Sequence, residues 1–349
     1  MYCLISVVIR QWSAVFEEAQ GYKRRLLDAS SASGVERPPV FRSASGSLLL
    51  VDWDAERILG SLELPKPTGF ILDRGRLEVA LWDHDAIATL SGPTITGQVG
   101  HPWFNHLHTI ERTPRGLLVT SSGTDLVAEI DDRGELVWAF FLFEHGYGGK
   151  RFPLGQGFDR SLNYNQRYMP AALSTHPNSA IALDDHTVLA TLFSTGELVR
   201  IDRRSDRVDV VLEGLKRPHA IRRRTEGGYM LCDTEGGAVV LLDRDLKREG
   251  QIPVQAPWIQ DAVLVGERLL VAGNRRLNLS ALGSGAATAA GSDNYVLELR
   301  GGQPRKRLNF GPESRVYMVE PIAKADAETL AHGWRGDSMG ASFERWEAP

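Results

Sequence analysis

The chain has 349 residues, 42% of them apolar, and a formal net charge of −4 at pH 7. This composition is that of an ordinary soluble protein and lacks the basic excess that usually marks a nucleic-acid partner. The length allows one large all-β domain with a substantial core. Two cysteines are too few for a disulfide framework, so we expect a reducing, cytoplasmic setting.

The N-terminal residues are expected to precede the main domain. Tyr2–Ile9 is an apolar run that is too short to cross a membrane and lacks the features of a signal peptide. It is predicted to be a β-strand, or a segment packed on the outside of the domain. Val15–Leu27 has the apolar spacing of a helix, and Ala29–Pro39 reads as a linker. We therefore assign residues 1–39 to a strand, helix and linker, and residues 40–349 to one domain.

A recurring unit organises the rest of the chain. Phe104–Gly146 reads as four short antiparallel strands joined by tight turns that contain Pro and Gly. Its third strand ends in Ile130-Asp131, and later copies end in Ile201-Asp202 and Leu242-Asp243. Four-stranded units that recur about every 40 residues are typical of propeller blades. The sequence therefore predicts an all-β fold, a six-bladed β-propeller.

The ring is expected to close with strands from both ends of the chain. Ser47–Asp52 and Ile58–Leu64 form the first clear hairpin, and it needs inner partners. We expect Arg315–Ile322 and Ser342–Trp346 to supply them, which would leave no exposed sheet edge. The other five blades are predicted to begin near Pro67, His108, Asn178, His219 and Asp261.

Two long interruptions, Tyr147–Thr175 and Asn274–Asp293, leave the repeat on the face where the inner strands begin. Long segments above axial polar residues are typical of a lid over a pocket. We therefore expect Tyr147–Thr175 to be a lid-like insertion, whereas simple flexibility explains Asn274–Asp293 as well. The lid residues expected to bind a substrate are Arg151, Arg167, Tyr164 and Tyr168.

Polar residues begin several inner strands. His108, His219 and Asp261 are expected at equivalent places in three blades, and Ser179 with Asn178 in a fourth. The symmetry of a propeller would bring them together around one axis. Imidazole and carboxylate groups there can act as acid, base or nucleophile, or can bind a divalent metal ion. The predicted catalytic residues are His108, His219 and Asp261; the predicted metal ligands are His108, His176 and His219; Asn178 is predicted to bind the substrate.

Arginines supply a second element of the predicted site. Arg217 directly precedes Pro218 and His219, and a guanidinium group near a cavity suits an anionic ligand. The run Arg222–Arg224 is expected to be solvated near the opposite face. His332 is expected in a turn, with an axial position as the alternative.

The inner strands reading His108-Thr-Ile, Pro177-Asn-Ser-Ala-Ile and Pro218-His-Ala-Ile, with Ile-Asp at the ends of third strands, resemble known six-bladed propellers. The chain is similar to the arylsulfotransferase-like group and, more distantly, to the gluconolactonase/SMP-30-like and strictosidine-synthase-like groups. The resemblance covers about residues 40–320. It implies the propeller architecture and, in the first group, an axial histidine as a transient sulfo acceptor, for which His108 or His219 would be the candidate.

The other resemblances imply metals. Lactonase-like propellers hold a divalent cation through Glu, Asn and Asp, and here Asn178 and Asp261 would match, although histidines stand where that pattern has Asn or Glu. Propeller oxygenases hold iron through four axial histidines, for which His108, His176, His219 and His332 would have to converge.

Two classes of function follow. The first is an enzyme acting on a small, anionic or aromatic molecule in an axial pocket, as a hydrolase, oxidase or group transferase, with one divalent metal ion as a candidate cofactor. The second is a non-catalytic propeller that binds a peptide or protein on its upper face. Neither a nucleic acid nor a membrane is expected as a partner, and the oligomeric state is left open.

Overall fold

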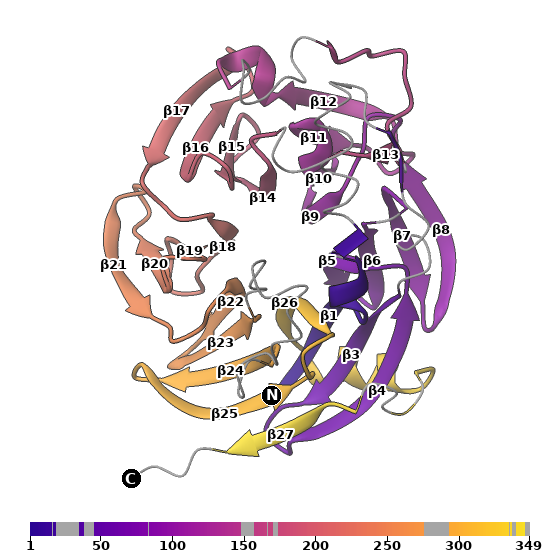
Figure 1. Ribbon diagram of the computed structural model, residues 1–349, viewed down its shortest axis with the longest axis vertical. Helices are drawn as coiled ribbons and strands as arrows, with labels where there is room; N and C mark the ends of the chain where they lie inside the picture. Colours follow the sequence, from indigo (N-terminus) through magenta and orange to yellow (C-terminus); the bar gives the residue numbers. More distant parts are fainter. Residues whose placement is uncertain are drawn as a thin grey trace.

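Six antiparallel sheets surround one axis, so the prediction of an all-β, six-bladed propeller is confirmed (Figure 1). The computed structural model describes residues 1–15, 17–18, 35–37, 45–82, 84–147, 157–165, 167–169, 174–275, 293–334, 336 and 340–345. Arg151, the side chain of Tyr168 and most of Asn274–Asp293 lie outside this description, and so does Trp346.

Blades 2 to 5 and the first four strands of blade 6 are each continuous in sequence, and their strands follow chain order from the axis outward. Strands with alternating or fully apolar patterns and turns at Gly or Asp account for this regularity. Blade 2 consists of β5 (Pro67–Asp73), β6 (Arg76–Leu81), β7 (Ala86–Ser91) and β8 (Thr94–Gly100). Blade 3 consists of β9 (Leu107–Thr113), β10 (Gly116–Ser121), β11 (Leu126–Ile130) and β12 (Leu136–Phe141).

The next three blades repeat this plan. Blade 4 consists of β14 (Pro177–Ala182), β15 (Thr187–Leu192), β16 (Glu197–Asp202) and β17 (Arg207–Leu212). Blade 5 consists of β18 (His219–Arg223), β19 (Tyr229–Asp233), β20 (Ala238–Leu242) and β21 (Arg248–Pro253). Blade 6 consists of β22 (Ile259–Val265), β23 (Arg268–Gly273), β24 (Tyr295–Arg300) and β25 (Gln303–Asn309).

Blade 1 combines strands from both ends of the chain, as expected, but in a different order. From the axis outward it contains β26 (Arg315–Ile322), β1 (Tyr2–Ile9), β3 (Gly46–Asp52) and β4 (Arg57–Leu64). β1 therefore lies inside the blade, paired on both sides, and not on the outside of the propeller. Its side chains are almost all buried, which suits an apolar run between two strands.

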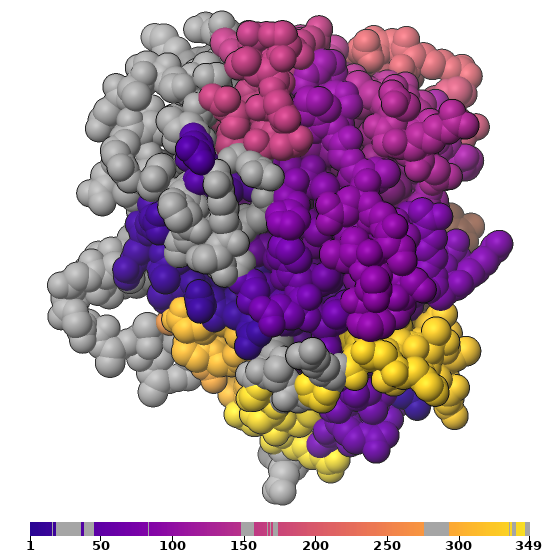
Figure 2. All heavy atoms as spheres, turned by 90° about the vertical axis from the view of Figure 1, so that its right-hand side faces the viewer, coloured from indigo at the N-terminus to yellow at the C-terminus, as the bar shows by residue number. Residues whose placement is uncertain are grey.

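Ser342–Arg345 forms β27, which corrects the expectation that it would be an inner partner of blade 1. β27 instead pairs with β25 as a fifth, outer strand of blade 6. Three of its four residues are exposed or charged, a pattern that fits an outer edge and not a position near the axis. In Figure 2 the C-terminal segments lie beside the early strands, where the ring closes.

Buried side chains join blade 1 to both of its neighbours. Trp53 is fully buried against blade 6, where its indole Nε1 donates a hydrogen bond to Glu298 at 2.6 Å. Trp334 packs among apolar residues of blades 1 and 2, such as Leu48 and Leu90. These contacts hold blade 1, which is built from both ends of the chain, against blades 6 and 2.

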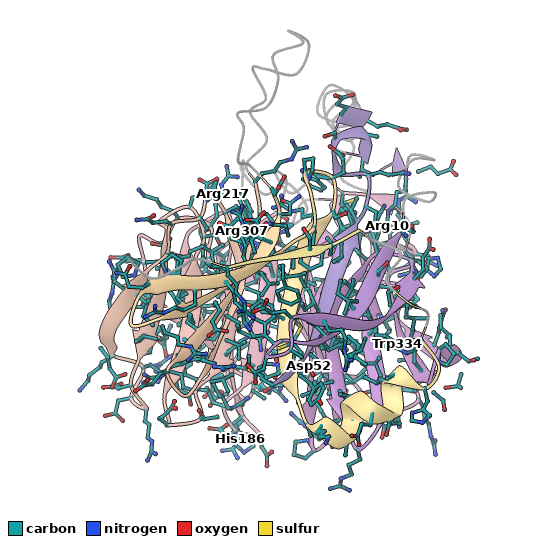
Figure 3. All side chains as sticks on the ribbon, turned by 90° about the horizontal axis from the view of Figure 1, so that it is seen from below. Arg10, Asp52, His186, Arg217, Arg307 and Trp334 are labelled. Atoms are coloured by element: carbon teal, nitrogen blue, oxygen red, sulfur yellow. The ribbon has the colours of Figure 1, made fainter. Side chains whose placement is uncertain are left out.

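The inner strands begin on one face of the propeller, here called the upper face. Arg217 lies on this side in Figure 3, whereas His186, Trp334 and helix α4 (Lys324–Ala331) lie on the lower side. The short strands β2 (Val35–Glu36) and β13 (Arg167–Tyr168) pair with each other. Residues 12–15 and 17–18 are helical, in part where a helix was expected.

Two further findings concern membrane-spanning helices and the cysteines. Among the described residues, no helix has the length and apolar character needed to cross a bilayer. Cys3 and Cys232 are both buried as free thiols.

Candidate functional site

Two rings of residues, one residue from each blade, surround the upper end of the axis. Equivalent backbone pairs fix the positions, for example Pro67 with Leu81 and Pro177 with Leu192. In every inner strand, the residue before this backbone pair lies on the rim, and the residue after it lies one position further along the axis, below the rim. The rim ring is Lys66, His106, His176, Arg217, Trp258 and Arg315. The inner ring is Thr68, His108, Asn178, His219, Gln260 and Tyr317.

The backbone of the rim is held in an unusual conformation. Four rim residues have positive φ, which is uncommon outside glycine and needs support from the surroundings. Buried carboxylates give that support: Asp85 accepts the N–H of His106 at 2.6 Å, and Asp125 accepts the N–H of His176 at 3.0 Å. The four residues and their φ values are Lys66 (46°), His106 (53°), His176 (58°) and Arg217 (58°).

Imidazole and aromatic rings contact one another in sequence around the upper axis. The ring centres of His108 and His176 lie 4.8 Å apart in a T-shaped arrangement. Phe193 continues the series, 5.0 Å from His176 and 5.4 Å from His219. Trp258 lies 5.7 Å from His219 on its other side. The structure thus brings together His108, His176 and His219, as the sequence predicted.

His219 is held in one tautomer by its neighbours. Its Nδ1 lies 3.0 Å from the carbonyl oxygen of Arg217 and 2.8 Å from the hydroxyl of Thr234. The Thr234 hydroxyl donates its own hydrogen to the carbonyl of Ile259, so it accepts from His219. Nδ1 therefore carries the proton, and Nε2 carries a lone pair that no described residue engages.

His108 and His176 have buried ring nitrogens that lack hydrogen-bond partners among the described residues. Nδ1 of His108 lies 2.6 Å from the hydroxyl of Tyr317, but its Nε2 has no partner. Nδ1 of His176 has none either. Buried polar atoms in folded proteins are nearly always paired, so two unpaired nitrogens on adjacent rings indicate a place for a water or ligand atom.

All three imidazoles are neutral near pH 7. Burial lowers the pKa of His219 to about 3 and that of His176 to about 4, and the charge of Arg217 acts in the same direction on both. Burial also places the pKa of His108 well below its usual value, with help from the other two histidines. A neutral imidazole can accept or donate a hydrogen bond, as acid–base chemistry requires.

A cavity of about 540 Å³ extends along the axis below the inner ring. This volume lies within the range of small-molecule sites. Ala323 and Asp326, next to and within α4, border it toward the lower face. At its upper end it is bordered by Asn178, His219, Gln260 and Tyr317.

Asp261 lies one residue beyond the inner-ring position that the sequence predicted. Blades 2 to 6 all have a register irregularity at this place, so Asp261 corresponds to Ser179 of blade 4 and not to Asn178. Gln260 occupies the inner ring instead. The Asp261 carboxylate accepts hydrogen bonds from Arg222 at 2.6 and 2.9 Å and from the N–H of Val319 at 2.9 Å. It therefore does not orient the histidines among the described contacts.

Arg222 is correspondingly not the solvated residue expected. Its side chain is only 16% exposed and also pairs with Glu320. Burial alone would lower the pKa of Arg222, but the two carboxylates raise it overall. The cavity is thus walled on one side by a nearly buried ion-pair network of Arg222, Asp261 and Glu320.

Two amides complete the upper end of the cavity. Oδ1 of Asn178 accepts a hydrogen bond from Thr191 at 2.7 Å, whereas its buried Nδ2 has no partner among the described residues. Oε1 of Gln260 accepts one from the indole of Trp258 at 2.9 Å. Asn178 and His219 both line the cavity, so Asn178 offers an amide donor in the cavity that His219 also borders.

The described part of the lid-like insertion packs on blade 3. Tyr164 is fully buried, its ring stacks on Phe158 at 4.6 Å, and its hydroxyl accepts the N–H of Asp159. This packing gives Tyr164 a structural role and does not support the predicted substrate contact. Arg167 lies in β13, and its carbonyl oxygen accepts a hydrogen bond from Asn105.

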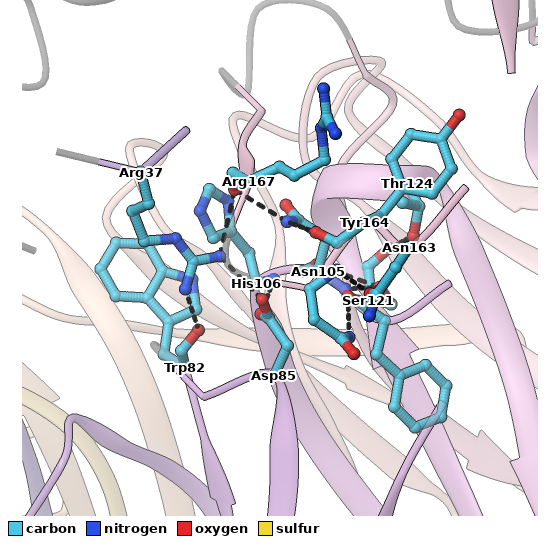
Figure 4. A network of polar contacts seen from close by, with 12 residues as sticks. Arg37, Trp82, Asp85, Asn105, His106, Ser121, Thr124, Asn163, Tyr164 and Arg167 are labelled. Carbon is cyan, nitrogen blue, oxygen red and sulfur yellow. Dashed lines mark hydrogen bonds and ion pairs between the residues drawn. The ribbon is translucent and has the colours of Figure 1, made fainter. Parts of the chain in front are cut away.

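Asn105 and Arg37 fasten this insertion and the N-terminal segment to the rim (Figure 4). Nδ2 of Asn105 donates to the carbonyls of Tyr164 and Arg167 at 2.7 and 2.9 Å. Arg37 and Asp85 form an ion pair at 2.8 Å with both side chains fully buried. Asp85 thereby joins Arg37 to the backbone of the rim.

The donor set fits a metal ion poorly. Among the described residues, no three His, Cys, Asp or Glu side chains are arranged to hold a metal. His332 ends α4 on the lower side, where its Nδ1 lies 2.6 Å from the carbonyl of Glu328. It therefore does not join the axial histidines, which rules out the four-histidine arrangement with His332, and a turn at the helix end is the better description.

Sequence reasoning missed the rim residues Trp258 and Arg315, and it noted His106 beside His108 without giving it a role. All three stand two positions before an inner-ring residue. Because alternate residues of a strand lie on the same side, this spacing was the available signal. Trp12 also reaches the rim, since Arg315 lies over its ring at 4.5 Å.

No protein-family model matches the chain, and no curated protein matches it. Solved structures are similar in fold. A protein of unknown function from Bacteroides caccae has a TM-score of 0.56 at 13% identity, over 80% of this chain and 95% of that one. A nidogen/laminin complex has a TM-score of 0.54 at 8% identity, over 91% and 97%. Virginiamycin B lyase from Staphylococcus aureus, bound to quinupristin, has 0.48 at 9%, over 83% and 95%. At these identities the likeness concerns the fold alone.

Proposed function

We propose that the protein is an enzyme that acts on a small molecule at the upper end of the axial cavity, with His219 as the proton-transferring residue. The fixed tautomer of His219 carries this proposal. Two acceptors hold the proton on Nδ1, and Nε2 is left with a lone pair beside a cavity. A base oriented through its other ring nitrogen is the arrangement that general acid–base catalysis uses.

The neighbouring groups suit a reaction in which a proton moves and negative charge develops. The unpaired amide N–H of Asn178 is a donor for a developing oxyanion. His108, linked to Tyr317, is a second neutral acid or base on the same ring. Hydrolysis, elimination and group transfer all need this combination, so the reaction class stays open among them.

This scheme does not need a divalent metal ion. The low pKa of His219 reflects burial and nearby positive charge, so an anionic substrate would raise it. Substrate binding would then turn His219 into a stronger base than it is in the free protein.

Untargeted metabolite profiling tests the proposal because it requires no assumption about which compound is the substrate. A small-molecule extract is incubated with the protein, and mass spectrometry identifies compounds that are consumed. We expect the wild type to consume at least one compound and His219→Gln to lose at least 100-fold of that rate. His332→Gln, at the other end of the molecule, is the matched control and should behave as wild type.

The alternative is a propeller that binds without turnover. Equal consumption by wild type and His219→Gln would overturn the catalytic role of His219. Retention of a compound by the protein, with no consumption, would favour the binding protein instead. Thermal unfolding of each variant separates loss of chemistry from loss of fold.

A further inference from the structure

The guanidinium group of Arg315 lies over two indole rings on the rim. Its Cζ is 4.5 Å from the ring centre of Trp12 and 5.0 Å from that of Trp258. Such cation–π contacts involve the face of the guanidinium and leave its N–H groups available at the edge. The side chain of Arg315 donates no hydrogen bond to any described residue and forms no ion pair with one, whereas its backbone pairs with Ile9 of β1.

The carboxylates nearby are engaged elsewhere. Glu313 pairs with Arg275 at 2.9 Å, and Glu235 pairs with Arg217 at 3.3 Å. Residues 148–156 and 276–292 of the two insertions contain no Asp or Glu in the sequence, so the absence of a counter-charge for Arg315 concerns the described residues and these two segments. A half-buried arginine without a counter-charge is unfavourable, and an external anion would remove this cost.

A second arginine adds to the positive field at the same tryptophan. The Cζ of Arg217 lies 5.9 Å from the ring centre of Trp258 and 5.2 Å from that of Phe193. Its side chain is 48% exposed, so it can reach a ligand. Burial and the nearby Arg275 lower the pKa of Arg315 to about 10, which still leaves it charged at neutral pH.

We infer that the rim beside Trp258 binds a planar organic anion, with Arg315 as the main anchor for its carboxylate or other oxyanion group. The edge of Arg315 provides parallel N–H donors that match a carboxylate. The rings of Phe193 and Trp258, whose centres lie 6.0 Å apart, border this anchor and offer an aromatic surface to the ring of such a ligand. Arg217 supplies a second positive charge on the exposed side.

This inference deepens the proposed function, because it names the ligand class of the same axial end. The anion-binding inference and the proposed catalytic role of His219 can be contradicted independently. Anion binding at Arg315 needs no proton transfer, and proton transfer by His219 needs no particular charge on the ligand. His219→Gln should therefore bind the probes below as the wild type does.

Binding is measured by tryptophan fluorescence and calorimetry with 2-naphthoate and benzoate, and with benzamide as the neutral probe of the same shape as benzoate. We expect binding of both carboxylates, at least tenfold weaker binding of benzamide, and at least tenfold weaker carboxylate binding by Arg315→Gln. Arg315→Lys, which keeps the charge without the planar fork, should fall between them.

Arg307→Gln is the matched control. Arg307 also lies over an aromatic ring, that of Tyr295 at 5.7 Å, but it already pairs with Glu344. This variant should bind the probes as wild type does. No carboxylate binding, equal binding of benzamide and benzoate, or unchanged binding by Arg315→Gln would each overturn the inference. Thermal unfolding of Arg315→Gln checks that a loss of binding is not a loss of fold.

Discussion

The hydroxyl oxygen of Tyr317 lies 2.6 Å from Nδ1 of His108, although the two residues come from blades 1 and 3. Blade 2, which lies between them, contributes only the small Thr68 to the inner ring. Thr68 turns its hydroxyl to the carbonyls of Ala80 and Leu107 and so leaves room for the contact. One hydrogen bond thus ties the strand that closes the propeller to its central histidine.

Tyr317→Phe removes this hydrogen bond and leaves Nδ1 of His108 buried without a partner. We expect a loss of about 1–3 kcal/mol in the free energy of unfolding, measured by urea denaturation. Nitrogen NMR of the imidazole should show a change in the tautomer balance of His108. Tyr295→Phe is the control, since the Tyr295 hydroxyl bonds no described residue, and it should change stability far less. Equal effects of the two variants would contradict the assignment.

Asp261→Ala should destabilise the protein because it leaves Arg222 nearly buried with only Glu320 as a charged partner. Breaking a buried ion pair by removing one partner costs about 3–5 kcal/mol. The lower end of that range applies here, because Glu320 remains. Asp209 on β17 forms exposed ion pairs with Arg200 and Arg207, so Asp209→Ala should cost less than about 1 kcal/mol. Urea denaturation compares the two, and a small effect at both sites would show that the axial pair is not important for stability.

Asp125 should make stability fall as the pH rises. Burial raises the pKa of Asp125 to about 7, although hydrogen bonds from Thr175 and His176 act in the opposite direction. Between its unfolded pKa of about 4 and this value, the folded state binds more protons than the unfolded state, so deprotonation favours unfolding. Asp125→Asn keeps a hydrogen-bond acceptor and cannot ionise. Its stability relative to wild type should therefore increase from pH 4 to pH 8 in urea titrations. Parallel curves would refute the raised pKa.

Ser6→Pro tests the central place of β1 in blade 1. Ser6 is fully buried and pairs with both Met318 and Leu48. Proline removes a backbone donor and fits poorly within a central strand, so we expect a loss of about 3 kcal/mol or more. Thr96→Pro, at a register irregularity of the outer strand β8, is the control and should be milder. If circular dichroism melting shows similar stability for both, β1 is not an essential strand.

The blade architecture was predictable from turns and strand patterns in the local sequence. The strand order of blade 1, which closes the ring, was not. Turns and repeated Ile-Asp ends placed the four strands of blade 3 correctly within Phe104–Gly146. For Tyr2–Ile9 both a strand and a segment packed on the outside were predicted, because an apolar run has the same pattern whether it lies in a sheet or against one. Nothing local indicates that this strand inserts between β26 and β3, because that pairing joins segments about 300 residues apart.

The candidate site shows the same division. His108, His176 and His219 converge as expected, because repeated strand starts must meet at the axis. Asp261 was misplaced by one residue, because the similar strand starts Asp261-Ala-Val and His219-Ala-Ile stand one position apart in the registers of their blades. Trp258 and Arg315 were overlooked because the equivalence of rim positions becomes visible only once the registers are known.

The strand order of blade 1 also determines when during translation the propeller can close. The N–H of Met318 in β26 bonds to the Ser6 side chain in β1 across 312 positions of the chain. At roughly 5–20 residues per second, β1 waits about 15–60 s on the ribosome before β26 exists. During that interval one edge of β1 and the flanks of blades 1 and 6 have no partner. The nascent chain therefore passes through an open ring that is prone to aggregation, and the propeller closes only after translation of its last inner strand.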